Sequence, residues 1–151
     1  MKRILWIEDE GKIELVQYKA PLVRGGYAVD IASDATEAVQ LLIEKRYDAI
    51  IFDLIFPCGD EFETDEYYVG LELLRRLIKQ EIKGVDKYDP TKIMVFTVVN
   101  DSEVHDKIKE LGVQTILGKR LNELEDLKNC VDELFEVKLM KDESTEKNHI
   151  A

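Results

Sequence analysis

The residue best placed to do chemistry in this chain is Asp53, because it follows directly after a short apolar run. Ala49 to Phe52 are all apolar, and a run this short, bounded by turn signals, is typical of a strand covered on both faces. Open α/β sheets place their chemistry where strands end, and Pro57 stops the backbone from continuing the ladder. On this stretch alone, a turn that begins at Asp53 is an equally good interpretation, because aspartate is common in turns.

A second apolar run ends in acidic residues at the start of the chain. Arg3 to Ile7 predicts a strand, and Glu8 and Asp9 follow it. If the two strands are parallel neighbours, Glu8, Asp9 and Asp53 meet at one edge of the sheet and repel each other. A divalent cation offsets that repulsion, and Mg²⁺ is the usual ion where few protein carboxylates share the coordination with a phosphate. A cation from the chain itself, Lys119, is a second candidate for this role.

Composition argues against several kinds of partner. The chain has 151 residues and a net charge of −11, with 32 acidic against 21 basic residues. This length predicts one domain with a real core, and the acidic balance argues against direct binding to nucleic acid or to an anionic membrane. No apolar run reaches the length of a membrane span, and we expect no signal peptide. Cys58 and Cys130 stand far apart without metal-ligand spacing, which favours reduced thiols and a cytoplasmic location.

The elements that must position these residues alternate regularly along the chain. Apolar periodicity and turn signals predict five strands, at about residues 3–7, 27–32, 49–52, 93–96 and 113–117, and five helices. The predicted class is α/β, with a doubly wound parallel sheet of right-handed crossovers and helices on both faces. The flavodoxin-like strand order 2-1-3-4-5 fits, and it makes Asp9 and Asp53 neighbours at one cleft. We expect a domain over residues 1–139 and a polar tail over residues 140–151.

Local signals predict details of individual helices. Asp34 and Glu37 form a capping-box-like pair ahead of the second helix. Pro21 falls late in the first helix, and we expect it to kink or shorten that helix. Neither histidine is expected to be a ligand or a base, because His105 is predicted on a helix surface and His149 in the polar tail.

Two further polar residues are expected beside the same cleft. Thr97 follows the fourth strand, and Lys119 follows the fifth. In the order 2-1-3-4-5 both flank the cleft of Asp53, so the predicted site holds acids for a metal, a central aspartate, a hydroxyl and an ammonium. Taken alone, Thr97 is more often a strand-end residue and Lys119 a solvated surface charge. The functional interpretation therefore depends on the whole set.

In this set and order, the chain resembles the receiver domain of two-component response regulators. The resemblance covers about Lys2 to Leu139, nearly the whole chain, and no single piece of it is specific. The residues that carry it are Glu8-Asp9, Asp53-Leu54-Ile55-Phe56-Pro57, Gly70 at the start of the third helix, Thr97 and Lys119. Together, at successive strand ends, they form a specific pattern.

The resemblance implies a role for each of these residues. Asp53 would accept a phosphoryl group from a histidine kinase or a histidine phosphotransfer protein, while Thr97 and Lys119 would contact the phosphoryl oxygens. The implied Mg²⁺ ligands are Glu8, Asp9, Asp53 and the backbone carbonyl of Ile55. Such a module switches a protein-interaction face that a downstream protein effector reads. It is not an enzyme, apart from its own phosphorylation from phosphodonors and its own dephosphorylation.

Several positions depart from the family pattern. Glu8 stands where many receivers have aspartate, and Ile116 where many have an aromatic residue. Arg120 stands where the family usually has a proline, often joined to the lysine by a cis bond, which costs roughly 3–4 kcal/mol for other residues. Ile55, Val98 and Val99 are all apolar and branched, and bulk at position 98 would hinder an attacking water. We therefore expect a long-lived phosphorylated form.

The stretch from Cys58 to Val69 is much longer than the corresponding loop of the family. It carries five acidic residues and no basic one. One interpretation is a solvated, mobile loop. The other is a partner-recognition or gating loop whose apolar anchors are Phe62, Tyr67 and Tyr68.

Two other function classes stay open. The first is an interaction module that keeps the receiver fold but is never phosphorylated, which Glu8, Arg120 and the long acidic loop favour. The second is a phosphohydrolase with Asp53 as nucleophile. Haloacid-dehalogenase-like phosphatases need a second aspartate two residues on, where this chain has Ile55, so this class ranks low. The chain is either a whole protein or a receiver excised from a longer one.

Overall fold

The computed structural model describes residues 1–9, 13–119 and 126–136. Its five strands pair in parallel in the predicted order β2-β1-β3-β4-β5. The strands are β1 (Arg3–Ile7), β2 (Ala28–Ala32), β3 (Ala49–Phe52), β4 (Ile93–Thr97) and β5 (Thr115–Gly118). Observed and predicted strand bounds agree within two residues, the largest difference being the start of β5. The doubly wound, flavodoxin-like fold is therefore confirmed.

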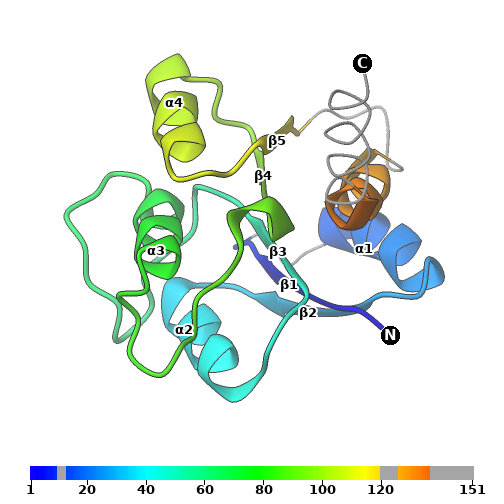
Figure 1. Ribbon diagram of the computed structural model, residues 1–151, viewed down its shortest axis with the longest axis horizontal. Helices are drawn as coiled ribbons and strands as arrows, with labels where there is room; N and C mark the ends of the chain where they lie inside the picture. The colour runs from blue at the N-terminus through cyan, green and yellow to red at the C-terminus, as the bar shows by residue number, and fades with distance from the viewer. Residues whose placement is uncertain (10–12, 120–125, 137–151) are drawn as a thin grey trace, which may run out of the picture.

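Helices cover both faces of the sheet (Figure 1). Four are bounded within the described residues: α1 (Ile13–Arg24), α2 (Ala35–Glu44), α3 (Val69–Ile78) and α4 (Ser102–Glu110). Residues 126–136 are helical as well, and a short 3-10 helix, η1 (Pro90–Lys92), precedes β4. Helices α2 and α3 lie on one side of the sheet, and α1 and the 126–136 helix on the other (Figure 1). No helix in the described ranges is both long and apolar enough to span a membrane.

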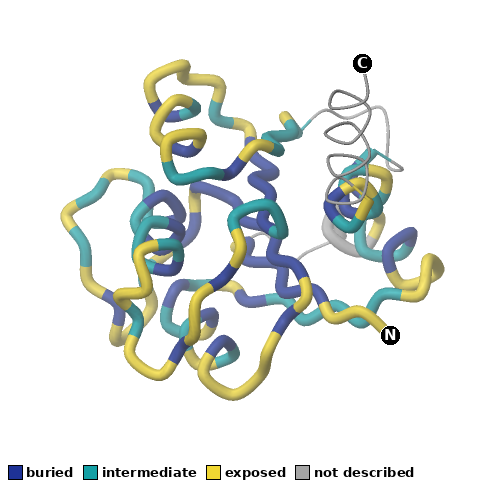
Figure 2. Tube along the Cα trace, in the orientation of Figure 1, coloured by how far each residue is buried: buried dark blue, intermediate teal, exposed yellow. Residues whose placement is uncertain are grey.

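The strands alternate between two apolar cores, as the two-residue period of a strand requires. In β1, Leu5 and Ile7 face the core beneath α2 and α3, whereas Ile4 and Trp6 face the core beneath α1. All four side chains are fully buried. Figure 2 shows β1, β3 and β4 as the buried centre of the molecule, with exposed residues on the outer sides of the helices. The central strands are therefore rigid supports for whatever lies at their ends.

The predicted helix signals have mixed outcomes. Asp34 is the N-cap of α2: its carboxylate accepts a hydrogen bond from Glu37 N at 2.7 Å, and Glu37 Oε2 accepts one from Ser33 N at 3.1 Å. This reciprocal pair is a capping box. The expected shortening at Pro21 does not occur, because α1 continues to Arg24.

Candidate functional site

Strand register brings Glu8 and Asp53 to the same face of the sheet. Trp6 pairs with Ile51 across β1 and β3, and Glu8 and Asp53 each come two residues later. Asp53 N donates to Ile7 O at 3.0 Å, so the register continues past the end of β3. Because side chains two residues apart in a strand share a face, both carboxylates extend the same row. Glu8 is 1% and Asp53 5% exposed.

The two oxygens of the Asp53 carboxylate are held by different groups. Oδ1 accepts a hydrogen bond from Leu54 N at 2.7 Å, and Oδ2 accepts one from Lys119 Nζ at 3.0 Å. A backbone donor and an ammonium both favour the ionised carboxylate. The turn that begins at Asp53 is thus part of the site, since its Leu54 N–H fixes the orientation of the carboxylate.

Lys119 reaches the acidic cluster from the end of β5. Its backbone N donates to Thr97 O at 2.9 Å, and its ammonium forms ion pairs with both Glu8 and Asp53. Burial lowers the pKa of Lys119 to about 8. The lysine is therefore charged at neutral pH. It supplies the cation that the sequence indicated as an alternative to a metal.

The donor set around Glu8 and Asp53 fits a small hard cation. Glu8 Oε2 is buried and has no hydrogen-bond partner in the described part of the chain, so one carboxylate oxygen is left over after the ion pair with Lys119. Asp9, by contrast, is exposed. Within the described residues, no three acidic, histidine or cysteine side chains form a ready metal cluster. Two of the three carboxylates predicted to bind a metal, those of Glu8 and Asp53, thus lie together, whereas Asp9 is exposed at the edge of the site.

Thr97 completes the polar set at the end of β4. It is 1% exposed, and its Oγ1 accepts a hydrogen bond from Val99 N at 3.1 Å. Thr97, Lys119 and Ile116 all line a groove of about 520 Å³ that runs between the end of β4, α4 and β5. Ile55 and Val98 expose about half or more of their side chains, 52% and 63% respectively. Arg120 lies outside the described residues.

Helix α3 begins in direct contact with the turn after Asp53. Gly70 N donates to Leu54 O at 3.1 Å. A Cβ on residue 70 would overlap the carbonyl oxygen of Asp53, so only glycine allows the helix to approach this closely. This contact explains physically why Gly70 stands at the start of α3, a position that the sequence marked only through a resemblance.

The long loop between β3 and α3 is tied to two helices. Thr36 of α2 donates to Cys58 O at 2.8 Å and accepts from Glu61 N and Phe62 N at 3.0 and 3.2 Å. Arg76 of α3 stacks over the Phe62 ring at 4.4 Å and donates to Glu63 O at 2.7 Å. Phe62 is therefore buried and anchors the loop to the protein itself, whereas the partner-loop interpretation expected an apolar anchor for a partner.

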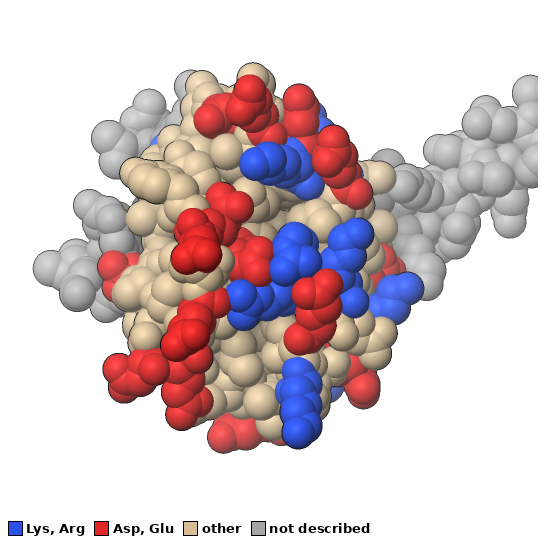
Figure 3. Space-filling model, turned by 90° about the vertical axis from the view of Figure 1, so that its left-hand side faces the viewer, with Lys and Arg blue, Asp and Glu red and all other residues tan. Residues whose placement is uncertain are grey.

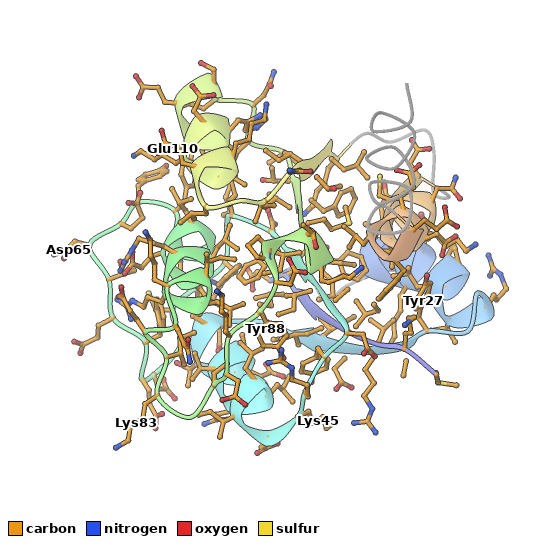
Figure 4. All side chains as sticks on the ribbon, in the orientation of Figure 1. Tyr27, Lys45, Asp65, Lys83, Tyr88 and Glu110 are labelled. Atoms are coloured by element: carbon orange, nitrogen blue, oxygen red, sulfur yellow. The ribbon has the colours of Figure 1, made fainter. Side chains whose placement is uncertain are left out.

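The remaining aromatic residues of this loop differ in exposure. Tyr67 is 85% exposed and contacts the half-buried Tyr68 edge-on at 4.9 Å. Acidic side chains form a band down this side of the molecule, next to a group of basic ones (Figure 3). Asp65 points outward at the far edge of the loop (Figure 4). Asp60, Glu61 and Glu63 are exposed as well, whereas Glu66 is half-buried.

One residue of this region, His105, makes a contact that the sequence did not predict. His105 was expected on the surface of its helix, but it is half-buried, and its Nε2 lies 2.9 Å from Val99 O. A histidine four residues after the helix-capping Asp101 gave no signal of this contact, because the contact depends on how the β4–α4 loop folds back over α4.

Comparison with known proteins supports one family. No family model matches the chain. Response regulator MprA of Mycobacterium sp. is 26% identical over 92 residues, which is 56% of this chain and 40% of that protein. Sensor histidine kinase AruS of Pseudomonas aeruginosa is 28% identical over 113 residues, 75% of this chain and 10% of the kinase. A receiver domain protein (CheY-like) from Methanospirillum hungatei has a solved structure that matches with a TM-score of 0.64 and 25% identity, over 90% of this chain and 98% of the other.

The chain resembles response-regulator receiver domains. Response regulator TrrA from Thermotoga maritima, solved in complex with Mg(2+)-BeF, has a TM-score of 0.60 and 24% identity, over 89% of this chain and 99% of the other. A response regulator from Burkholderia pseudomallei, with a phosphorylated aspartic acid, a calcium ion and citrate, has a TM-score of 0.63 and 22% identity, over 93% and 73%. At these identities the two structures show a shared receiver fold. The chain spans less than half the length of the curated relatives it matches.

Proposed function

We propose that this chain is a phosphoryl-accepting receiver module of a phosphorelay, with Asp53 as the acceptor. The observation that carries the proposal is the carboxylate of Asp53, buried at a strand end, with one oxygen bonded to Leu54 N and the other to the ammonium of Lys119. A positioned, ionised carboxylate beside a cation is the arrangement that phosphoryl transfer to an aspartate needs. The proposed module consists of residues 1–139, and the proposed tail, residues 140–151, lies outside the described residues.

In the proposed step, an Asp53 oxygen attacks the phosphorus of a phosphohistidine on the partner. The new O–P bond forms as the P–N bond breaks, and the electron pair of that bond stays on the histidine ring. The Lys119 ammonium neutralises charge on the phosphoryl oxygens, and the Thr97 hydroxyl donates to one of them. Positioning and charge neutralisation of this kind are the main contributions of a protein to phosphoryl transfer.

The proposed metal ligands are the carboxylates of Glu8, Asp9 and Asp53 and the backbone carbonyl of Ile55. A bound Mg²⁺ would supply positive charge to the phosphoryl oxygens. Support comes from the partnerless Glu8 Oε2, and from the metal ions and the phosphorylated aspartic acid named for structures of the same fold. Glu8 carries one methylene more than an aspartate, and this longer side chain also brings its carboxylate into contact with Lys119.

We propose a histidine kinase or a histidine phosphotransfer protein as the donor, and a downstream protein effector as the reader, in the cytoplasm. The match to a response regulator and to a sensor histidine kinase supports this assignment. An acidic chain with a net charge of −11 is poorly suited to bind DNA directly. The module therefore acts through protein contacts, and its only chemistry is the gain and loss of its own phosphoryl group.

The second candidate is a receiver fold that works without phosphorylation. The ion pairs of Lys119 with both carboxylates favour it, because they offset part of the negative charge of the pocket without a metal. A receiver fold without phosphorylation gives no role to the Thr97 hydroxyl, which lies beside the same groove. Mg²⁺ binding separates the two candidates.

The test is phosphoryl uptake measured by intact mass. The protein is incubated with acetyl phosphate and Mg²⁺, alongside Asp53→Asn and a sample without metal. We expect a gain of one phosphoryl group that disappears in both controls. The absence of any gain, with no effect of beryllofluoride and Mg²⁺ on the fluorescence of Trp6, would instead support the non-phosphorylated module. Trp6 suits this readout because it packs on Phe96, over which the Lys119 ammonium lies.

A further inference from the structure

Two hydrogen bonds connect the hydroxyl of Thr97 to helix α4. Thr97 Oγ1 accepts from Val99 N at 3.1 Å, and Val99 O lies 2.9 Å from His105 Nε2. Because a carbonyl oxygen can only accept, His105 Nε2 carries the proton. Both backbone groups of Val99 are therefore engaged, one by the site and the other by the helix.

Both ends of this hydrogen-bonded connection lie in regular secondary structure. Thr97 is buried and belongs to β4, while His105 lies in the first turns of α4 and is half-buried. Its neighbour Val104 is 6% exposed and packs into the core beneath α2 and α3. A displacement of Val99 thus reaches α4 by two routes, the backbone of residues 100 and 101 that leads into the helix and the side-chain hydrogen bond of His105.

A hydroxyl can accept one hydrogen bond while it donates another. When the Thr97 hydroxyl rotates to donate to a phosphoryl oxygen on Asp53, its hydrogen bond from Val99 N has two possible outcomes. Either the bond is kept and the Val99 peptide moves with the hydroxyl, or the bond breaks. In either case the Val99 carbonyl moves relative to α4. The His105 bond then transmits that movement or breaks, and each outcome shifts the first turns of the helix.

There is room for this change beside His105. The groove of about 520 Å³ is lined by Thr97, Val99, His105 and Ile116. The Ile116 side chain has no hydrogen-bonding group, so it cannot respond through a hydrogen bond to the position of the Thr97 hydroxyl. From this groove, the His105 side chain bonds to the loop that follows Thr97.

We infer that His105 is a positioning residue that transmits the state of Thr97 to helix α4 through the Val99 peptide. The inference rests on the proposed function, since it needs a phosphoryl group on Asp53 to move Thr97. His105 touches neither the phosphoryl group nor Asp53 in this scheme. Its contribution is to the output, not to the phosphoryl transfer.

The test compares amide NMR shifts across α4 before and after saturation with beryllofluoride and Mg²⁺. His105→Leu keeps an apolar side chain of similar size and removes the donor, so we expect the shift changes across α4 to fall about twofold or more, in the range of known coupling residues. His105→Gln has an amide N–H that can reach the same carbonyl, and we expect it to restore the response. Lys107→Ala, at an exposed position of the same helix, is the matched control and keeps the full response.

Phosphoryl uptake by intact mass keeps the two hypotheses apart. We expect every variant to take up one phosphoryl group as the wild type does. A full α4 response in His105→Leu overturns the inference, and so does an equal loss in His105→Leu and His105→Gln, which would show that ring shape matters and not the hydrogen bond. A wild type that takes up the group without any α4 response also overturns it. A wild type that takes up nothing contradicts the proposed function first.

Discussion

The molecule contains two clusters of acids and cations that differ in burial. The buried cluster joins Glu8 and Asp53 through Lys119 at the end of the sheet. The surface cluster joins Glu72 to Arg75 and Arg76 on α3, at 2.8 and 2.7 Å. In the buried cluster acids outnumber the cation, whereas the surface cluster has two arginines for two carboxylates, because Arg75 also pairs with Glu81 at 3.2 Å.

This difference in charge balance distinguishes a candidate binding site from a cluster that supports the fold. An excess of buried negative charge is costly, and it can persist where an added cation is part of the function. The surface cluster is fully matched, lowers the pKa of Glu72 to about 2 through its hydrogen bonds to Arg75 and Arg76, and positions the arginine that holds the loop at Phe62. Paired carboxylates and cations therefore leave the buried cluster able to accept a ligand, whereas in the surface cluster they hold the backbone of the long loop.

The largest expected effect comes from removing the buried cation. Lys119→Met leaves Glu8 and Asp53 without their shared partner, so we expect the free energy of unfolding without Mg²⁺ to fall by about 2–3 kcal/mol. Arg75→Met, at the surface, is expected to lower it by no more than about 1 kcal/mol. Urea unfolding at pH 7 measures both, and equal losses in the two variants would contradict the contrast drawn between the clusters.

Removing an acid distinguishes the clusters by their affinity for metal. Glu8→Gln takes a carboxylate from the proposed Mg²⁺ site, and we expect the affinity for Mg²⁺ to fall by about tenfold or more. Glu72→Gln is the matched control and should leave that affinity unchanged, because Glu72 lies on α3 and is paired with arginines. Titration of Trp6 fluorescence with Mg²⁺ gives both values. An unchanged affinity in Glu8→Gln would remove Glu8 from the metal site.

The surface cluster should contribute stability that depends on pH. The pKa of Glu72 is lowered from 4.5 to about 2 in the folded protein, so the unfolded state takes up its proton first as the pH falls. The contribution is therefore complete above about pH 5 and is lost between pH 4.5 and 2. We expect Glu72→Gln to be less stable than the wild type by about 1 kcal/mol at pH 7. Urea titrations at decreasing pH should show that gap narrowing; a constant gap would contradict the assignment.

The smallest expected effect lies in the long loop. Tyr67 is 85% exposed, so Tyr67→Ala should change the free energy of unfolding by less than about 0.5 kcal/mol. Phe62→Ala removes the ring beneath Arg76 and should lower it by about 1–2 kcal/mol. Thermal unfolding compares the two, and a large loss in Tyr67→Ala would mean that this side chain also supports the fold.

The sequence predicted the fold well, because its strands are apolar runs that end in polar residues and its turns carry clear signals. It also predicted that Glu8, Asp53, Thr97 and Lys119 would gather at one edge. Strand alternation could have separated Glu8 from Asp9 in advance, since Glu8 shares the parity of Ile4 and Trp6. The same alternation directs Asp9 to the opposite side from Glu8, in agreement with its exposure.

Two other features could not be predicted in this way. The hydrogen bond from His105 depends on the path of an irregular loop, for which no periodic pattern exists. The attachment of the long loop depends on Thr36 and Arg76, which are distant in sequence and ordinary in type. Contacts of this kind are set by tertiary packing, where a single side chain meets whichever backbone group passes it.

The hydrogen bond between Gly70 N and Leu54 O has a consequence for how such modules diversify. The chain leaves the site at Leu54 and returns to the same point at Gly70, so the length of the intervening segment is not linked to the position of Asp53. Ala35 N also bonds to Pro57 O at 3.0 Å, which holds the outgoing end a second time. Segments of different length or charge can therefore be exchanged here without rebuilding the acceptor, which makes this loop a natural point for grafting new partner specificity.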